Sequence, residues 1–94
     1  MFIKLFSIKK SSDGSYYLSE VRVNVSHISF ITENQEYSKL LREGKMGLDL
    51  SPMVKFSNLS LNSSGSGLRE MVVVGEPEII ESKMLKSRKQ LLRG

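Results

Sequence analysis

The stretch Val21-Arg22-Val23-Asn24-Val25 is the clearest strand in the sequence and the best guide to the fold. Its valines alternate with polar residues, and successive side chains of a β-strand point to opposite faces of a sheet. We therefore predict a strand with one buried face and one exposed face. On its N-terminal side the strand begins with Tyr16, Tyr17 and Leu18.

Another strand is predicted before it. Residues 2–8 are rich in apolar side chains but show little helical periodicity, which indicates a strand covered on both faces. Asp13-Gly14 lies between the two strands, and this dipeptide can adopt the positive φ angles of a tight hairpin turn.

Beyond Val25 the chain is predicted to turn a corner and form a third strand. Asn24 and Ser26 can both bond to the nearby backbone through their side chains, which favours a corner at residues 24–27. Residues 28–31 then contain enough apolar side chains for a short strand.

Residues 34–52 form an insertion that we expect to contain a short helix. Asn34 can cap this helix and Gly44 can end it. The apolar residues of the insertion have two possible roles, because they can anchor it on the core or remain exposed and contact a partner. The candidate residues for partner contact are Tyr37, Leu41, Met46, Leu48 and Leu50.

The C-terminal part of the sequence predicts two further strands and a helix. The apolar pattern of residues 54–61 changes phase at Ser57-Asn58, and a β-bulge there would place all its apolar side chains on one face. Residues 62–67 are predicted to be a flexible hairpin loop before a last strand at 68–74. Pro77 suits the first position of a helix, and apolar residues recur at helical spacing as far as Leu92.

These elements predict a mainly β fold of the α+β type. We expect a small bent or barrel-like antiparallel sheet of about five strands, a short helix in the insertion and a C-terminal helix. Residues 1–82 would form one small β-rich domain, and 83–94 the basic end of the helix. Domains of this size bury only about 60% of their unfolded surface, so we expect self-association to stabilise this one.

The composition argues against catalysis. The chain has 94 residues, no cysteine and one histidine, which excludes disulfides, thiolate zinc sites and cysteine nucleophiles. His27 lies beside Ser26, but nucleophilic catalysis also needs an orienting group that the sequence does not indicate. The acidic residues Glu76, Glu78 and Glu81 are typical of the first turn of a helix. We therefore predict a protein that is not an enzyme and needs no cofactor or metal ion.

The positive charge is concentrated at one end of the chain. The formal net charge is +4, although residues 1–82 contain nine basic and ten acidic side chains. The excess comes from Lys83, Lys86, Arg88, Lys89 and Arg93. These cations can complement the dipole at the C-terminal end of a helix, or they can bind nucleic acid or an acidic partner.

The sequence has no recognisable targeting or membrane segment. Lys4 interrupts the apolar N-terminal residues, which therefore lack the continuous apolar stretch of a secretory signal. No apolar run approaches the roughly 18 residues of a membrane span. We expect a soluble, cytoplasmic protein that does not bind membranes.

Two segments resemble the small FlbD-like β-proteins, namely residues 21–31 (VRVNVSHISFI) and 71–81 (MVVVGEPEIIE). The resemblance implies a small, strongly bent sheet and a non-catalytic accessory role, and it carries over no functional residues. The insertion at 34–52 and the basic end are departures from that pattern. In its size, its many serines and its lack of cysteine, the sequence also resembles small accessory proteins of tailed bacteriophages.

From the sequence we predict a non-enzymatic interaction or regulatory module that binds a protein partner and self-associates. The alternative is an RNA- or DNA-binding protein that uses the basic C-terminal segment.

Overall fold

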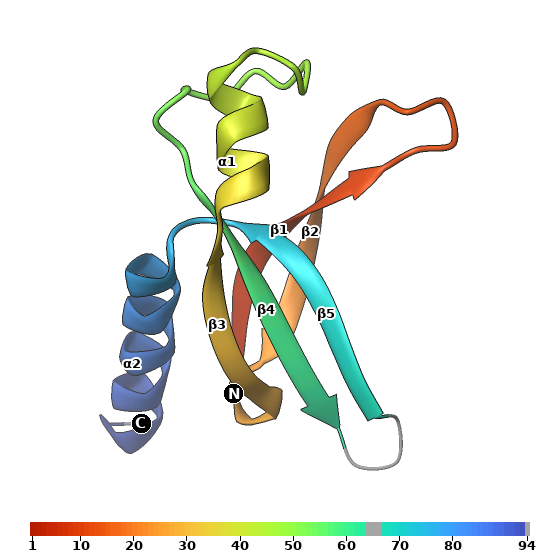
Figure 1. Cartoon of the computed structure of the whole chain (residues 1–94). Helices are drawn as coiled ribbons and strands as arrows, with labels where there is room; N and C mark the ends of the chain where they lie inside the picture. Colours follow the sequence, from red (N-terminus) through yellow and green to blue (C-terminus); the bar gives the residue numbers. More distant parts are fainter. Residues whose placement is uncertain (64–66, 94) are drawn as a thin grey trace.

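Within residues 1–63 and 67–93, which the computed structural model describes, five antiparallel strands form one sheet in the order β2-β1-β5-β4-β3 (Figure 1). Side chains are described for 1–62 and 67–87. The strands are β1 (Phe2–Lys10), β2 (Tyr16–Asn24), β3 (Ile28–Asn34), β4 (Phe56–Ser63) and β5 (Gly67–Val74). A 3-10 turn η1 (Val25–His27), helix α1 (Gln35–Arg42) and helix α2 (Pro77–Arg93) complete the fold, which confirms the predicted class.

The first two strands form the predicted hairpin. They pair along their whole length, from Phe2 opposite Asn24 to Lys10 opposite Tyr16. Gly14 adopts a φ of +89° in the turn, where a residue with a side chain would be strained. Hydrogen bonds from Ser11 and Ser15 to the Asp13 carboxylate stabilise its charged form and lower its pKa to about 2.

The remaining strands form a meander in which β4 lies between β3 and β5. The predicted corner is η1, where the Asn24 side chain accepts a hydrogen bond from the Ser26 amide at 3.0 Å. The meander joins the hairpin through β1 and β5, where Ser7 lies opposite Val73. The predicted loop at 62–67 connects β4 to β5, and its residues 64–66 lie outside the described part of the chain.

The prediction that β1 is covered on both faces is wrong. Ile3 and Leu5 are buried, whereas Phe2 and Phe6 on the opposite face are 62% and 44% exposed. Helix α1 and its following loop cover that opposite face near Ile8, at the far end of the strand. The aromatic side chains nearer the N-terminus therefore remain open to solvent.

The predicted β-bulge at Ser57-Asn58 is also wrong. β4 pairs with β5 in one uninterrupted register, and the irregularity lies in β3, between Ile28 and Phe30. The apolar pattern of β4 changes phase because both faces of this strand are buried. Phe56 packs into one core cluster and Leu59 into another, and both side chains are 0% exposed.

Two core clusters lie on opposite faces of the sheet. In β5, Val73 belongs to the first cluster, whereas Val72 and Val74 pack against the second. The first core cluster consists of Ile3, Leu5, Val23, Val25, Leu59, Val73 and Ile80. The second core cluster consists of Ile8, Leu41, Met46 and Phe56.

The insertion contributes Leu41 and Met46 to the second core cluster instead of forming an exposed apolar surface. Leu41 and Met46 are 6% and 4% exposed, so the expectation that they are open to a partner is wrong. Tyr37, Leu48 and Leu50 are half-buried and pack against the same cluster. The apolar residues of the insertion therefore anchor it on the sheet, which is the other role that the sequence left open.

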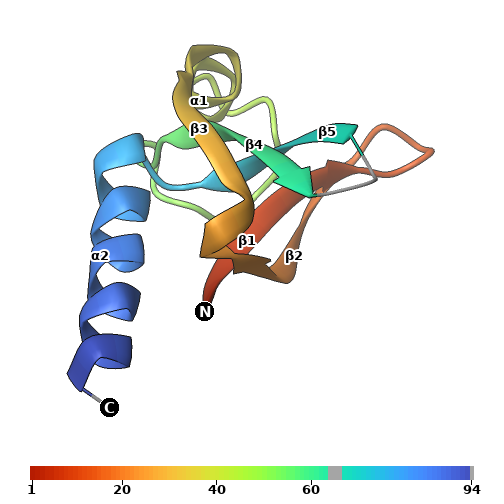
Figure 2. The ribbon, with the colours of Figure 1, turned by 90° about the horizontal axis from the view of Figure 1, so that it is seen from below.

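The two helices lie on different sides of the sheet (Figures 1 and 2). Asn34 caps α1 by accepting a hydrogen bond from the Tyr37 amide at 2.9 Å. α2 begins at Pro77, as predicted, and packs on the first core cluster through Ile80 and Met84. Figure 2 shows the C-terminal end of α2 lying away from the strands. None of the described helices is long and apolar enough to cross a membrane.

Candidate functional site

A groove of about 660 Å³ lies where β1, the segment before β4, the end of β5 and the start of α2 meet. Three apolar side chains at this groove are exposed, Phe6 at 44%, Ile79 at 49% and Met53 at 84%. Exposed apolar side chains gathered at a concave surface are typical of binding sites. The groove is lined by Lys4, Leu5, Phe6, Met53, Val54, Lys55, Val74, Gly75, Glu76, Ile79 and Lys83.

Regular secondary structure determines the direction of the groove's main side chains. Lys4 and Phe6 are two residues apart on β1, so both point to the exposed face of this strand. Ile79 and Lys83 are four residues apart on α2 and share one face of the helix. Ile80, which directly follows Ile79, packs in the first core cluster and holds the helix in place.

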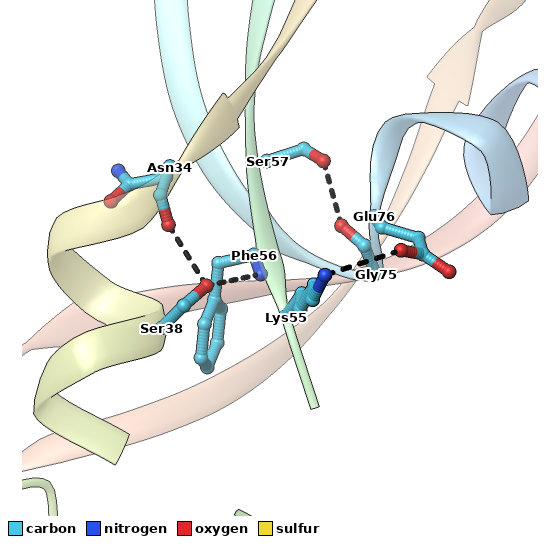
Figure 3. Close-up of polar contacts among 7 residues, drawn as sticks. All are labelled: Asn34, Ser38, Lys55, Phe56, Ser57, Gly75 and Glu76. Carbon is cyan, nitrogen blue, oxygen red and sulfur yellow. Dashed lines mark hydrogen bonds and ion pairs between the residues drawn. The ribbon is translucent and has the colours of Figure 1, made fainter. Parts of the chain in front are cut away.

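Hydrogen bonds hold one wall of the groove together, and Figure 3 draws the one between Ser57 and Gly75. The Gly75 amide donates to the Lys55 carbonyl at 2.8 Å, and the Ser57 hydroxyl donates to the Gly75 carbonyl at 2.7 Å. Gly75 has a φ of +119°, a conformation that side-chain-bearing residues rarely adopt. This glycine lets the chain leave β5 and enter α2 while staying bonded to the segment before β4.

Ser38 joins α1 to the same region (Figure 3). Its hydroxyl donates to the Asn34 carbonyl at 2.9 Å and accepts from the Phe56 amide at 3.2 Å. Ser38 is 3% exposed, so water cannot readily replace it. The serine therefore fixes the start of β4, which directly follows the groove residues Met53–Lys55.

Replacing Ser38 with alanine is expected to lower the free energy of unfolding by about 1–3 kcal/mol, because the buried Phe56 amide would lose its acceptor. Urea denaturation followed by circular dichroism measures this change. Ser82→Ala, at an exposed position of α2, is the control and should change stability by less than about 0.5 kcal/mol. Equal stabilities of the two variants would contradict the role assigned to Ser38.

The charged side chains that line the groove are three lysines and one glutamate. Lys55 lies 3.9 Å from the Glu76 carboxylate, and both side chains are partly exposed, so this ion pair contributes little to stability. Among the described side chains, Lys4 and Lys83 make no ion pair. The lining of the groove is therefore largely apolar, and its charged side chains give it a net positive charge.

Beside the groove, the exposed face of β1 carries aromatic and basic side chains in alternation. Phe2, Lys4 and Phe6 share this face, and Arg22 of β2 lies directly opposite Lys4. The signal was present in the sequence, because Phe2, Lys4 and Phe6 alternate with Ile3 and Leu5. The same run also fits a strand covered on both faces, so the alternation alone does not show that the Phe2 and Phe6 face is exposed.

The structure brings part of the predicted basic segment to the groove. Lys83 lines it, and Lys86 is exposed one turn further along α2. Arg88, Lys89 and Arg93 belong to α2, but their side chains lie outside the described part of the structure. The boundary between the nearly neutral residues 1–82 and the basic residues 83–94 therefore falls inside one continuous helix.

The other residues considered for chemistry are dispersed. His27 is exposed at the end of η1, and Glu78 and Glu81 are exposed on α2. Glu76 faces Lys55. Among the described residues, no three histidine, cysteine or acidic side chains are grouped so that they could hold a metal ion.

The chain matches no protein-family model, and no curated protein or solved structure matches it.

Proposed function

We propose that this protein is a non-enzymatic interaction module of the cytoplasm, with a regulatory or accessory role, and that the groove binds a protein partner. The observation that carries the proposal is the exposure of Phe6, Met53 and Ile79 at one concave surface. Burial of apolar surface is a main favourable contribution to protein association, and aromatic side chains often dominate binding energy. A partner that covers these three side chains would gain most of its affinity from them.

Self-association is the second part of the proposal. β2 and β3 form the two edges of the sheet, so each has one side without a strand partner in the described part of the chain. Exposed edges favour pairing with another chain. Tyr17 on β2 is 47% exposed and Phe30 on β3 is 48% exposed, which offers apolar contacts at these edges. Sedimentation velocity should show a concentration-dependent dimer or larger species, and a monomer at all concentrations would contradict this part.

Affinity capture from native cells, with and without nuclease, tests the binding of a protein partner. Ile79→Asp places a charge in the groove, and we expect it to reduce the captured partner at least about tenfold. An acidic residue is well tolerated in the first turn of a helix, so the variant should remain folded. Capture by the native sequence should be unaffected by nuclease.

Leu68→Asp is the matched control for this experiment. Leu68 is 58% exposed on β5 and does not line the groove, so its replacement should leave capture unchanged. If the two variants capture the same proteins in the same amounts, the groove is not the binding surface.

Nucleic-acid binding is the second candidate function, and the exposed face of β1 favours it. Phe2 and Phe6 could stack on bases while Lys4, Arg22 and the basic residues of α2 contact phosphates. Binding of a single-stranded oligonucleotide should then weaken steeply with salt. It should also be lost when Lys83, Lys86, Arg88, Lys89 and Arg93 are replaced with glutamine. Binding that survives these replacements would contradict this function for the basic segment.

A further inference from the structure

We propose that the segment bound in the groove is an acidic peptide with apolar anchor residues. Its apolar side chains would pack on Phe6 and Ile79, and its carboxylates would face Lys4 and Lys83. This inference rests on the proposed function and adds the chemical class of the partner.

The charges around the groove select an acidic partner. Glu76 is the acidic residue among the lining side chains, and it already lies 3.9 Å from Lys55. Lys4 and Lys83 are exposed and have no ion-pair partner among the described side chains. A basic segment would meet like charges at both positions, whereas carboxylates would neutralise them.

The position of Lys83 in α2 supports a binding role for its charge. α2 runs from Pro77 to Arg93, so Lys83 lies in the first half of the helix. The helix dipole attracts cations within the last turn, which is too far from Lys83 to account for it. Its place four residues after Ile79 puts it on the face of α2 that lines the groove.

The apolar lining of the groove favours a peptide over a nucleic acid. Phe6 is the one aromatic side chain in the lining, and the other apolar side chains are aliphatic or methionine. Bases bind single-stranded sites by stacking on successive aromatic rings, and Phe2 lies outside this lining. A mainly aliphatic lining that also contains lysines matches leucine-like or phenylalanine-like side chains flanked by carboxylates.

Selection from a library of random peptides displayed on mRNA tests the proposal even though the natural partner is unidentified. Peptides selected on the native protein should contain aspartate and glutamate at least about twice as often as the starting library, next to large apolar residues. The same selection on Ile79→Asp should not recover these peptides. Leu68→Asp should recover them.

Fluorescence anisotropy with the most enriched peptide measures the contribution of the two lysines. Replacing Lys4 and Lys83 together with glutamine should weaken binding about three- to tenfold, because each exposed ion pair contributes modestly. Replacing Lys9 and Lys39, which are exposed outside the groove, is the control and should change affinity less than about twofold. An oligouridylate competitor should not displace the peptide.

The outcomes separate the two proposals. Selected peptides that depend on Ile79 but are neutral or basic would overturn the acidic partner and leave the groove as the binding surface. The acidic partner would also be overturned if the variant lacking Lys4 and Lys83 bound the peptide as tightly as the variant lacking Lys9 and Lys39. Failure to select any peptide that depends on Ile79, together with unchanged capture by Ile79→Asp, would overturn the proposed function itself. Displacement by oligouridylate would assign the surface to nucleic acid instead.

Discussion

Replacement of Phe56 with alanine is expected to lower the free energy of unfolding by about 3–5 kcal/mol. Phe56 is 0% exposed and is the largest fully buried side chain among those that the structure describes. It packs in the second core cluster, where its ring meets the Tyr37 ring edge-on at a centroid distance of 6.2 Å. Alanine would leave a cavity between β4 and α1 that the surrounding residues cannot fill completely.

The expected loss is comparable to the whole stability of a small domain, which is about 5–15 kcal/mol and nearer the lower value at this size. The variant should therefore be partly unfolded in the absence of denaturant. Urea denaturation of the native protein and the variant measures the difference. Phe30→Ala is the control, because Phe30 is 48% exposed and should cost less than about 1 kcal/mol. A loss below about 1 kcal/mol for Phe56→Ala would contradict the packing described for the second core cluster.

The neighbouring isoleucines of α2 should respond very differently to replacement. Ile80 is 0% exposed and packs in the first core cluster, so Ile80→Ala should lower the free energy of unfolding by about 2–4 kcal/mol. Ile79 is 49% exposed at the groove, and Ile79→Ala should lower it by less than about 1 kcal/mol. Both substitutions remove the same atoms from the same helix, so helix propensity cancels in the comparison.

The two substitutions should also weaken partner binding for different reasons, Ile79→Ala directly and Ile80→Ala through the packing of α2. Ile79→Ala would weaken partner binding in a protein of nearly native stability. Ile80→Ala would weaken it by releasing α2, which amide hydrogen exchange would detect as loss of protection along the helix. Equal destabilisation by the two variants would show that α2 does not pack through Ile80.

Most of the local structure could be predicted from the sequence, because short-range chemistry determines it. Four local features each depend on residues within a few positions in the sequence. They are the turn at Asp13-Gly14, the corner at Asn24, the cap at Asn34 and the helix start at Pro77. A side-chain cap, a positive φ angle or a missing amide has the same consequence in most tertiary contexts. The alternation of valines likewise placed β2 correctly.

The groove could not be predicted, because it joins segments that are far apart in the sequence. Phe6, Met53 and Ile79 come from three separate parts of the chain, and the residues beside them in the sequence do not indicate that they line one surface. The basic segment was visible as a charge imbalance. That Lys83 and Lys4 face the same groove depends on how α2 packs on the sheet.

The sequence by itself determined the type and order of the elements, the hairpin and corner chemistry, and the concentration of positive charge in α2. Tertiary structure decided which apolar side chains are covered. The sequence predicts that a bulge places Phe56 and Leu59 on the same face of their strand, but they pack into separate clusters on opposite faces of the sheet. Phe2 and Phe6 looked buried but are exposed, whereas Leu41 and Met46 looked available to a partner but are buried. The physical reason is that hydrophobic burial is non-directional, so an apolar residue packs against whichever surface the rest of the chain brings to it.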